Sequence, residues 1–306
     1  MISVIIATKD RQEKLIRCVG SILKNSTSKS PMFEVIVVDQ SKRNNSKHFL
    51  DQIKTDRVSH YFFPKASKSL ALNFGVARAS GNIIAFTDDD CEARSTWLTN
   101  IQKTFKKYPG VSGVFGKVEP YEPRANKGRF CPSTILRKKL LVVSKPCRHW
   151  QKLGYGNNMA FRKKVFKETF FRSWLGPGSW GGTAEDAWFA LRLLTSGHSL
   201  MYEPKIVVSH NRWLNYRQKV KQRWLYLCGQ SACYGYYFFE GVGLAKRVVV
   251  ADLKDLYFKL REILKRLLFL KLGSGLLLLA VDLCGEFVFK ARGLAVALYY
   301  FHRERV

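Results

Sequence analysis

Three adjacent carboxylates, Asp88, Asp89 and Asp90, follow the short apolar run 83–86 after a single threonine. Adjacent anions repel one another unless a cation or several hydrogen-bond donors lie among them. Carboxylate oxygens suit Mg2+ or Mn2+, and the carboxyl end of a strand in an open α/β sheet is where ligands bind. If the chain stays extended, Asp88 and Asp90 point to one side and Asp89 to the other. A solvated acidic turn or a helix N-cap is the alternative reading.

Further candidates for binding or proton transfer stand at two other places. Asp39 ends the apolar run 35–38, and Glu185-Asp186 precedes an apolar pattern with helical spacing. Acids in a first helical turn ordinarily cap the helix, and the helix dipole there favours the ionised form of Asp186. His210 lies at the end of the predicted strand 201–208, where a histidine is commonly only a structural residue. These alternatives stay open on residue types alone.

Strand-like and helix-like segments alternate through the first 90 residues. Strands are predicted over 2–7, 34–38, 59–63 and 83–86, with helices over 12–23, 47–55 and 68–79. This alternation predicts a parallel sheet with right-handed crossovers. Asp39 and the 88–90 acids would then share one edge of the sheet.

A second series of elements follows residue 96. The pattern predicts a helix over 97–108, strands over 111–118 and 201–208, a small-residue turn within 155–161 that leads into a strand, and a helix from 183 to a stop at Gly197. The polar passage 119–146 is predicted to be exposed and mobile, and the four glycines in 175–182 predict a loop that can move.

Composition limits the class of protein. A chain of 306 residues with 46% hydrophobic content can fold into a globular structure. The excess of 52 basic over 23 acidic residues gives a charge of +29, which predicts an anionic partner, either nucleic acid or membrane. Seven cysteines without a zinc spacing favour reduced thiols in the cytosol, and the apolar start at 2–6 reads as a strand and not as a signal peptide.

The basic residues concentrate after residue 211, where they alternate with aromatic and aliphatic side chains. Only ten uncharged residues, 272–281, lie between charged ones, whereas a membrane-spanning helix needs about 18 to 20. Asp282, Glu286 and Lys290 then form a polar stripe at intervals of four. These helices are predicted to lie in the plane of an anionic membrane surface; the alternative is a cap over the preceding domain.

Seven segments together resemble the family-2 glycosyltransferases of the GT-A fold. They are SVIIAT (3–8), VIVVD (35–39), ALNFGVA (71–77), GNIIAFTDDD (81–90), NNMAFR (157–162), EDAWFALRLL (185–194) and YEPKIVVSH (202–210). The resemblance implies a GT-A, Rossmann-like, mainly parallel mixed sheet flanked by helices, with a C-terminal amphipathic helical region. It predicts a catalytic domain over 1–211 and a membrane-associating region over 212–306.

Carried over residue by residue, the resemblance assigns the nucleotide to one group of side chains. Thr8 and Asp39 would hold the nucleoside, Lys68 would reach the nucleotide, Asp88 would bind the ribose, and Asp89 completes the nucleotide-binding set.

The same resemblance assigns the chemical step. Asp90 and His210 would hold Mg2+ or Mn2+ at the diphosphate, and Asp186 would act as general base on the acceptor hydroxyl. A single base without a nucleophile behind the sugar implies inversion at the anomeric carbon. Val220 departs from the pattern of the processive membrane synthases, which carry a glutamine at the matching position.

The predicted enzyme would move a sugar from a nucleotide-diphosphate donor, most commonly a UDP-sugar in this family, to a glycan or lipid-linked acceptor in cell-surface polysaccharide biosynthesis. Its predicted place is the cytoplasmic face of a membrane. One alternative is a basic nucleic-acid-binding protein, although the sequence contains no recognised nucleic-acid-binding module. The other is a catalytically inactive, nucleotide-binding membrane scaffold. Transfer from a nucleotide-sugar distinguishes the enzyme from both.

Overall fold

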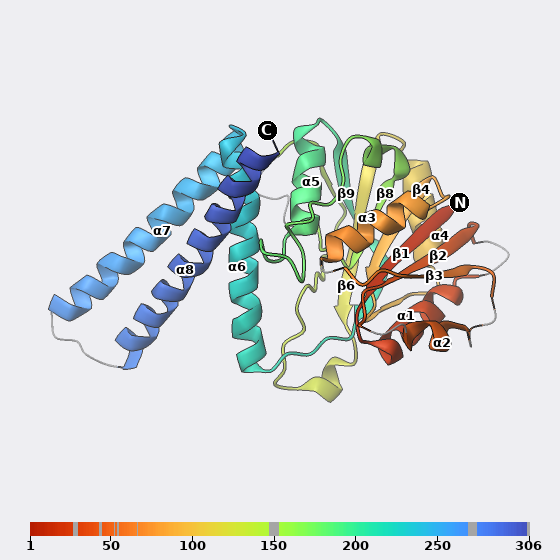
Figure 1. The fold of residues 1–306 in the computed structure, drawn as a ribbon, viewed down its shortest axis with the longest axis horizontal. Coiled ribbons are helices and arrows are strands. Elements are labelled where there is room, and N and C mark those ends of the chain that lie inside the picture. The colour runs from red at the N-terminus through yellow and green to blue at the C-terminus, as the bar shows by residue number, and fades with distance from the viewer. Residues whose placement is uncertain are drawn as a thin grey trace. The chain divides into compact units, whose positions relative to one another are not determined.

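The computed structural model describes residues 1–26, 30–42, 45–51, 53, 55–65, 67–146, 153–268 and 274–304 (Figure 1). The chain divides into two compact units. The first unit is Met1–Ser173 with Glu185–Arg217, and the second is Trp174–Ala184 with Gln218–Val306.

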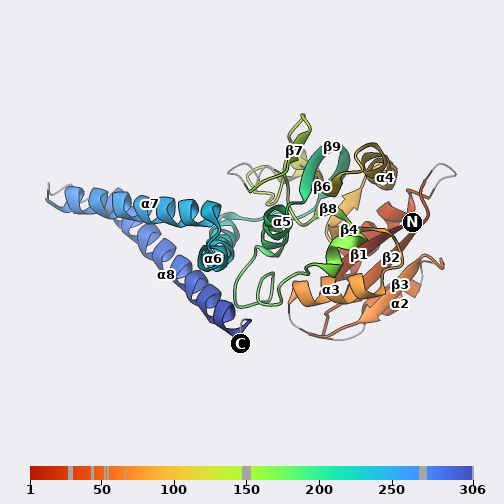
Figure 2. The same ribbon diagram turned by 90° about the horizontal axis from the view of Figure 1, so that it is seen from above.

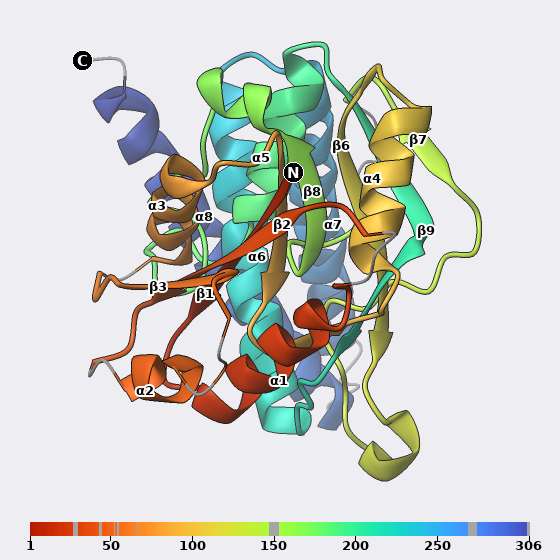
Figure 3. The same cartoon turned by 90° about the vertical axis from the view of Figure 1, so that its right-hand side faces the viewer.

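The first unit contains a mixed sheet with the strand order β3-β2-β1-β4-β8-β6-β9-β5, and β7 pairs with β9. The strands are β1 (Ile2–Thr8), β2 (Phe33–Asp39), β3 (Val58–Phe62), β4 (Ile83–Asp88), β5 (Cys91–Ala93), β6 (Val111–Pro120), β7 (Leu141–Val143), β8 (Asn158–Arg162) and β9 (Ser199–His210). The strands β1 to β4 run parallel and lie side by side, as the view of Figure 3 shows for β1, β2 and β3. Strand β8 runs antiparallel to both β4 and β6. The predicted mixed α/β fold flanked by helices is therefore confirmed.

Helices cover both faces of this sheet. They are α1 (Gln12–Leu23), α2 (Asn45–Asp51), α3 (Lys68–Arg78), α4 (Trp97–Lys107) and α5 (Glu185–Thr195), with short 3-10 turns η1 (Pro123–Asn126) and η3 (Lys163–Lys167). Val4 and Ile6 belong to the same buried cluster as residues of α1 and α4. Ile5 points to the opposite face and packs closely against Gly75 of α3. A Cβ added to Gly75 would lie 2.6 Å from Cγ2 of Ile5. Figure 2 shows α3 and α4 on opposite sides of the sheet.

The strand register brings the acidic strand ends together. Asp39 pairs with Thr8 on one side of β1, and Asp88 pairs with Ala7 on the other side. The predicted common edge of the sheet is thus confirmed for these two carboxylates.

The passage 119–146 is largely exposed, as its polar sequence predicted, but part of it is held against the sheet. β7 adds to the edge of β9, and Phe130 forms a bridge with Leu214. Cys131 and Pro132 between these contacts are buried. The two residues are buried because backbone pairing on both sides draws the segment against the sheet.

The second unit contains most of α6 (Tyr216–Phe239), together with α7 (Gly243–Leu268) and α8 (Ser274–Arg303). Gly293 of α8 permits close contact with α6, since a Cβ there would be 2.4 Å from the carbonyl oxygen of Cys228. The predicted polar stripe of α8 faces its neighbours: Glu286 accepts hydrogen bonds from Arg223 of α6 and Lys259 of α7, both at 2.7 Å. Part of the predicted apolar segment 272–281 lies outside the described residues.

Within the described residues, no helix is both long enough and apolar enough to cross a membrane.

Asn158 holds several elements of the first unit together. Its Oδ1 accepts a hydrogen bond from the indole Nε1 of Trp97 at 2.9 Å, and its Nδ2 donates to the carbonyl oxygens of Lys117 and Ile206. We expect Asn158→Ala to lower the free energy of unfolding by about 3 kcal/mol, because it leaves buried polar groups without partners. Asn100→Ala, which removes a more exposed hydrogen bond to Lys205, should cost less than about 1 kcal/mol. Equal losses in urea denaturation would contradict this role of Asn158.

Candidate functional site

Lys68 at the start of α3 is a cation shared by acids from two distant parts of the chain. Its Nζ lies 2.5 Å from Oδ1 of Asp88 at the end of β4 and 3.5 Å from Oε1 of Glu185 at the start of α5. Burial alone would lower the pKa of Lys68, but the facing carboxylates raise it, so Lys68 carries a full positive charge. The cation therefore lies between Asp88 and the helix that begins with Glu185 and Asp186.

Asp186 is fixed by backbone donors beside the same edge of the sheet. Its Oδ2 accepts a hydrogen bond from the amide of Gly156 at 2.6 Å, and its Oδ1 accepts one from the amide of Ala187 at 2.8 Å. Gly156 lies just before β8, whose first residue, Asn158, pairs with Thr87 of β4, next to Asp88. This connection places Asp186 close to Asp88.

The environment of Asp186 differs from a simple helix N-cap. Burial raises the pKa of Asp186, although the Gly156 amide and the Lys68 ammonium act in the opposite direction. The dipole of α5 thus does not dominate, contrary to the expectation from sequence. Asp186 remains partly exposed to solvent, whereas Glu185 is buried. A carboxylate that is reachable and has a raised pKa is well suited to accept a proton.

Asp89 and Asp90 share a second cation, Arg11. One guanidinium nitrogen, Nη1, lies 3.0 Å from Oδ1 of Asp89 and 3.0 Å from Oδ2 of Asp90. Asp89 also accepts a hydrogen bond from the hydroxyl of Thr8 at 2.8 Å, and burial raises the pKa of Asp89 to about 6. The expected alternation of the three acids is wrong: β4 ends at Asp88, and the chain turns through Asp89 and Asp90.

His210 adds an imidazole to this second group. Because β9 pairs with β5, His210 lies opposite Cys91, and its Nε2 lies 3.2 Å from Oδ1 of Asp90. Its Nδ1 lies 2.9 Å from the carbonyl oxygen of Pro132, which can only accept, so Nδ1 carries a proton. Burial opposes the charged imidazolium, but Asp90 raises the pKa of His210 to about 10. The imidazole is thus oriented with Nε2 toward the carboxylate.

Asp90 and His210 fit a divalent cation. Within the described residues, Oδ1 of Asp90 is buried without a well-aligned hydrogen bond, even though Nε2 of His210 is at ion-pair distance. The hydrogen bond from Nδ1 to a backbone carbonyl is the usual support of a histidine ligand. Cys91 lies within the same cluster, but its thiol belongs to the apolar core and burial raises its pKa well above the ordinary value. The hard oxygen and the imidazole suit Mg2+ or Mn2+ better than this thiol does.

Asp39 is held on the other side of β1. Its Oδ1 accepts a hydrogen bond from the amide of Ser41 at 2.8 Å, and its Oδ2 lies 3.3 Å from Nε2 of His60. Burial would raise the pKa of Asp39, but the hydrogen bonds from His60 and Ser41 lower it, so the carboxylate is ionised. The side chain of Asp39 is fully buried beside His60.

Three residues next to these site groups have positive φ angles without being glycine. Asp10 (φ 53°) precedes Arg11, Ser67 (φ 97°) precedes Lys68, and Ser133 (φ 53°) follows Pro132. Such backbone conformations cost about 1 to 3 kcal/mol each and persist only where the surrounding structure enforces them. The strain therefore falls at the residues that aim Arg11, Lys68 and the carbonyl partner of His210.

The sequence did not identify some residues of this site. Arg11, His60 and Gly156 were not among the candidate site residues. A signal for Arg11 was present, since it follows a buried strand at the same edge as the acids. No local pattern could have identified the Gly156 amide, because its role depends on the pairing of β8 with β4.

Comparison with known proteins identifies the family. The sequence profile described as "Glycosyl transferase family 2" matches residues 3–170, more than half of the chain. The chain belongs to glycosyl transferase family 2. The resemblance inferred from the seven sequence segments is thereby confirmed.

Two curated relatives of this family 2 chain come from Haloferax volcanii. Glycosyltransferase AglE is 31% identical over 121 residues, which are 39% of this chain and 39% of that protein. Glucosyl-dolichyl phosphate glucuronosyltransferase is 27% identical over 177 residues, which are 55% of this chain and 54% of that protein. The matches thus span about half or less of the relatives' length.

Solved structures support the fold. The mannosyltransferase PcManGT from Pyrobaculum calidifontis, in complex with GDP-Man and Mn2+, has a TM-score of 0.58 at 15% identity, covering 97% of this chain and 87% of that one. S. aureus TarS 1-349 has a TM-score of 0.57 at 15% identity, covering 76% and 64%. At these low identities, the structural similarity supports the GT-A fold and nothing more specific.

Lys68 should control the ionisation of the acids around it. We expect Lys68→Met to raise the pKa of both Asp186 and Glu185, because the ammonium favours the charged form of each carboxyl. The measurement is a 13C NMR titration of carboxyl carbons, with Asp186→Asn used for assignment. Lys65→Met, which removes an exposed charge three residues earlier, should leave both titrations unchanged. A titration of Asp186 that is the same with and without Lys68 would contradict this prediction.

Proposed function

We propose that the protein transfers a sugar, with inversion, from a nucleotide-diphosphate sugar to a hydroxyl or phosphate acceptor presented on a glycan or lipid. The observation that carries the proposal is the position of the Lys68 ammonium. It contacts Asp88 at the end of β4 and Glu185 at the start of α5, where Asp186 is the next residue. Acids nearly 100 residues apart in the sequence form one electrostatic group in a chain of glycosyl transferase family 2.

In this proposal each acid has its own task. Asp186 takes the proton of the acceptor as its oxygen attacks the anomeric carbon, and no carboxylate nucleophile is required behind the sugar. Asp88 faces the ribose, while Thr8, Asp39, Lys68 and Asp89 hold the rest of the nucleotide. A divalent ion bound by Asp90 and His210 would neutralise charge that develops on the diphosphate as the glycosidic bond breaks.

The relatives suggest classes of substrate. One curated relative is named as acting on a glucosyl-dolichyl phosphate, and solved structures of similar fold hold UDP-GlcNAc or GDP-Man. We therefore propose a UDP- or GDP-sugar as donor and a lipid-linked glycan as acceptor, in the assembly of a cell-surface polysaccharide.

The test of the reaction is a panel of UDP-, GDP- and dTDP-sugars, with Mn2+ or with EDTA. We expect one donor to be hydrolysed or transferred in the presence of Mn2+, with an inverted product by NMR. Asp186→Asn should lower turnover on the order of 100-fold while leaving donor affinity within about twofold, because it removes the base but not the nucleotide contacts. Asp51→Asn, on the exposed end of α2, is the matched control.

Two results would contradict the proposed reaction. Full turnover in Asp186→Asn would remove this residue from the chemistry. Failure to bind any nucleotide-sugar, together with salt-sensitive DNA binding, would favour the nucleic-acid alternative instead.

We also propose that the second unit attaches the enzyme to an anionic membrane surface on the cytoplasmic side. Six large apolar side chains of α7 are each 46% to 60% exposed and recur at alternating intervals of three and four, which places them on one helix face. They are Val250, Leu253, Tyr257, Leu260, Leu264 and Leu267. A soluble helix normally turns such a stripe inward.

The charges around this stripe favour anionic lipid. The exposed cations Lys254, Arg261 and Lys265 adjoin it on α7. Two acids of α7 instead form ion pairs: Asp255 with Lys259 at 3.1 Å, and Asp252 with Lys290 of α8 at 3.2 Å. The stripe is thus apolar with a cationic border on one side, a pattern that suits a helix lying in a membrane interface.

Leu253→Glu/Leu260→Glu should reduce binding to vesicles containing phosphatidylserine by at least about tenfold, because two carboxylates replace apolar contacts within the stripe. The control Asn82→Glu/Gln102→Glu makes the same change in charge on exposed positions of the first unit and should bind nearly as well as the unmodified protein. Flotation with anionic and with zwitterionic vesicles, at low and high salt, is the measurement. Binding that ignores lipid charge, or a stripe that instead pairs two copies in light scattering, would contradict the attachment.

A further inference from the structure

We propose that Arg11 is an exchangeable counter-ion: it neutralises Asp89 and Asp90 in the empty enzyme, yields Asp90 to a divalent cation, and then pairs with the diphosphate of the donor. This inference rests on the proposed function for its last step only. Its consequence is that cation and nucleotide bind cooperatively, through a residue of the protein that changes partner.

The contacts of Arg11 show why it can compete with a metal ion. A single nitrogen, Nη1, is 3.0 Å from an oxygen of Asp89 and 3.0 Å from an oxygen of Asp90, so it bridges the two carboxylates as a cation ligated by both would. Both acids are nearly buried, with side chains 6% and 2% exposed, whereas the side chain of Arg11 is 42% exposed. The acids are therefore fixed, and the cation is the group with room to leave.

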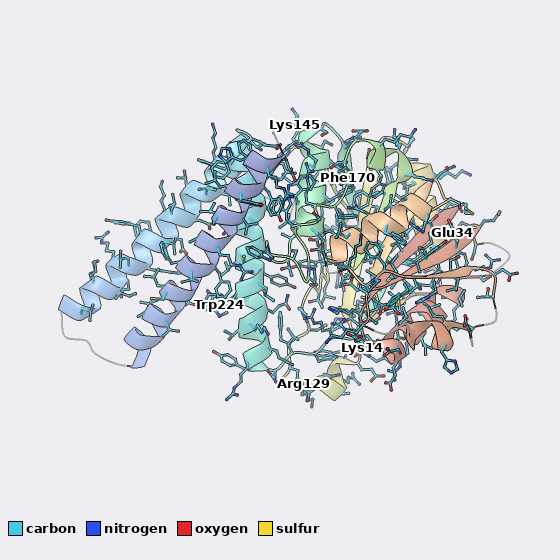
Figure 4. The ribbon with its side chains drawn as sticks, viewed as in Figure 1. Lys14, Glu34, Arg129, Lys145, Phe170 and Trp224 are labelled. Atoms are coloured by element: carbon cyan, nitrogen blue, oxygen red, sulfur yellow. The ribbon has the colours of Figure 1, made fainter. Side chains whose placement is uncertain are left out.

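The backbone at Arg11 is arranged to aim this side chain. Asp10 has a φ of 53°, and its amide donates a hydrogen bond to Oγ of Ser41 at 2.8 Å. Arg11 follows as the residue that precedes the first turn of α1. One turn later Lys14, labelled in Figure 4, is engaged elsewhere, because its Nζ donates to the carbonyl oxygen of Asn211 at 2.8 Å. Arg11 is thus the cation of α1 that contacts the two carboxylates directly.

The balance of charges determines when Arg11 leaves the carboxylates. With Arg11 in place, the charge of the two buried carboxylates is already partly balanced by a cation of the protein itself. A divalent cation at Oδ1 of Asp90 would lie beside the guanidinium on Oδ2 of the same carboxylate and repel it, which weakens the hold of the acids on Arg11. When a nucleotide diphosphate arrives with the cation, the displaced guanidinium gains phosphate oxygens, with which it pairs well. Each ligand therefore strengthens the binding of the other by the same factor.

The experiment compares the full-length protein with Arg11→Met and with Arg17→Met. Arg17 is an exposed cation on the same helix, so its removal reproduces the change in net charge without touching the acids. Mn2+ binding without nucleotide is measured by electron paramagnetic resonance. UDP and GDP binding, with and without Mn2+, is measured by calorimetry. Melting temperature in EDTA and in Mn2+ reports whether each variant is folded.

Arg11→Met should bind Mn2+ alone about tenfold more tightly than the unmodified protein, because its competitor for Asp90 is gone. The factor by which UDP or GDP tightens Mn2+ binding should fall by at least about tenfold, because no guanidinium remains to change partner. Mn2+ should also raise the melting temperature of Arg11→Met more than that of the unmodified protein, since only the variant lacks an internal cation. Arg17→Met should match the unmodified protein in all three measurements.

Mn2+ affinity that is unchanged or weaker in Arg11→Met would overturn the competition. Tighter Mn2+ binding with unchanged coupling to nucleotide would overturn the exchange and leave Arg11 a static counter-ion. Failure of the unmodified protein to bind UDP, GDP or any nucleotide-sugar of the panel would instead overturn the proposed function, while the arm with Mn2+ alone would still decide whether Arg11 competes.

Discussion

The site depends on internal cations that hold carboxylates from distant segments together. Asp88, Glu185 and Asp186 would repel one another at the edge of the sheet if Lys68 were absent. Two like charges 4 Å apart interact by about 4 kcal/mol at an effective dielectric constant of about 20, which is comparable with the whole stability of many domains. Lys68 turns this repulsion into attraction on both sides. The start of α5 and the end of β4 can therefore lie next to each other, and the acids stay close enough to act on one substrate.

Much of this arrangement follows from local sequence. Apolar runs that end in Asp39 and Asp88 predict parallel strands, and a parallel sheet places strand ends on one edge, as the register of both with β1 confirms. The helices α1, α3 and α4 follow from apolar spacing in the same way. The identity of the acids was therefore readable from the sequence, because strand ends and helix starts are local features.

The partners of those acids could not be predicted from the sequence, because they come from tertiary contacts that no short sequence pattern encodes. The turn at Asp89 and Asp90 replaces the alternation of an extended strand, so these two acids share Arg11 and Asp88 does not. Pro132, predicted to be exposed, is buried where it orients His210. The raised pKa of Asp186 has the same origin, since burial depends on tertiary packing and outweighs the local dipole of α5.

In α8 of the second unit, some charged side chains are buried while large apolar side chains are exposed, which is the reverse of the usual arrangement in a globular protein. Glu286 and Lys290 of α8 are buried, while Phe287 and Val288 beside them are more than half exposed. Burying ions costs desolvation that paired charges only partly recover, and exposing large apolar side chains to water forfeits about 25 cal/mol per Å2. A helical hairpin surrounded by water would lose on both counts. Contact of the outer face with hydrocarbon would remove the second cost, because the apolar side chains would then be buried there while the paired charges stay between the helices. The inverted order therefore supports the proposed attachment of these helices to a lipid surface.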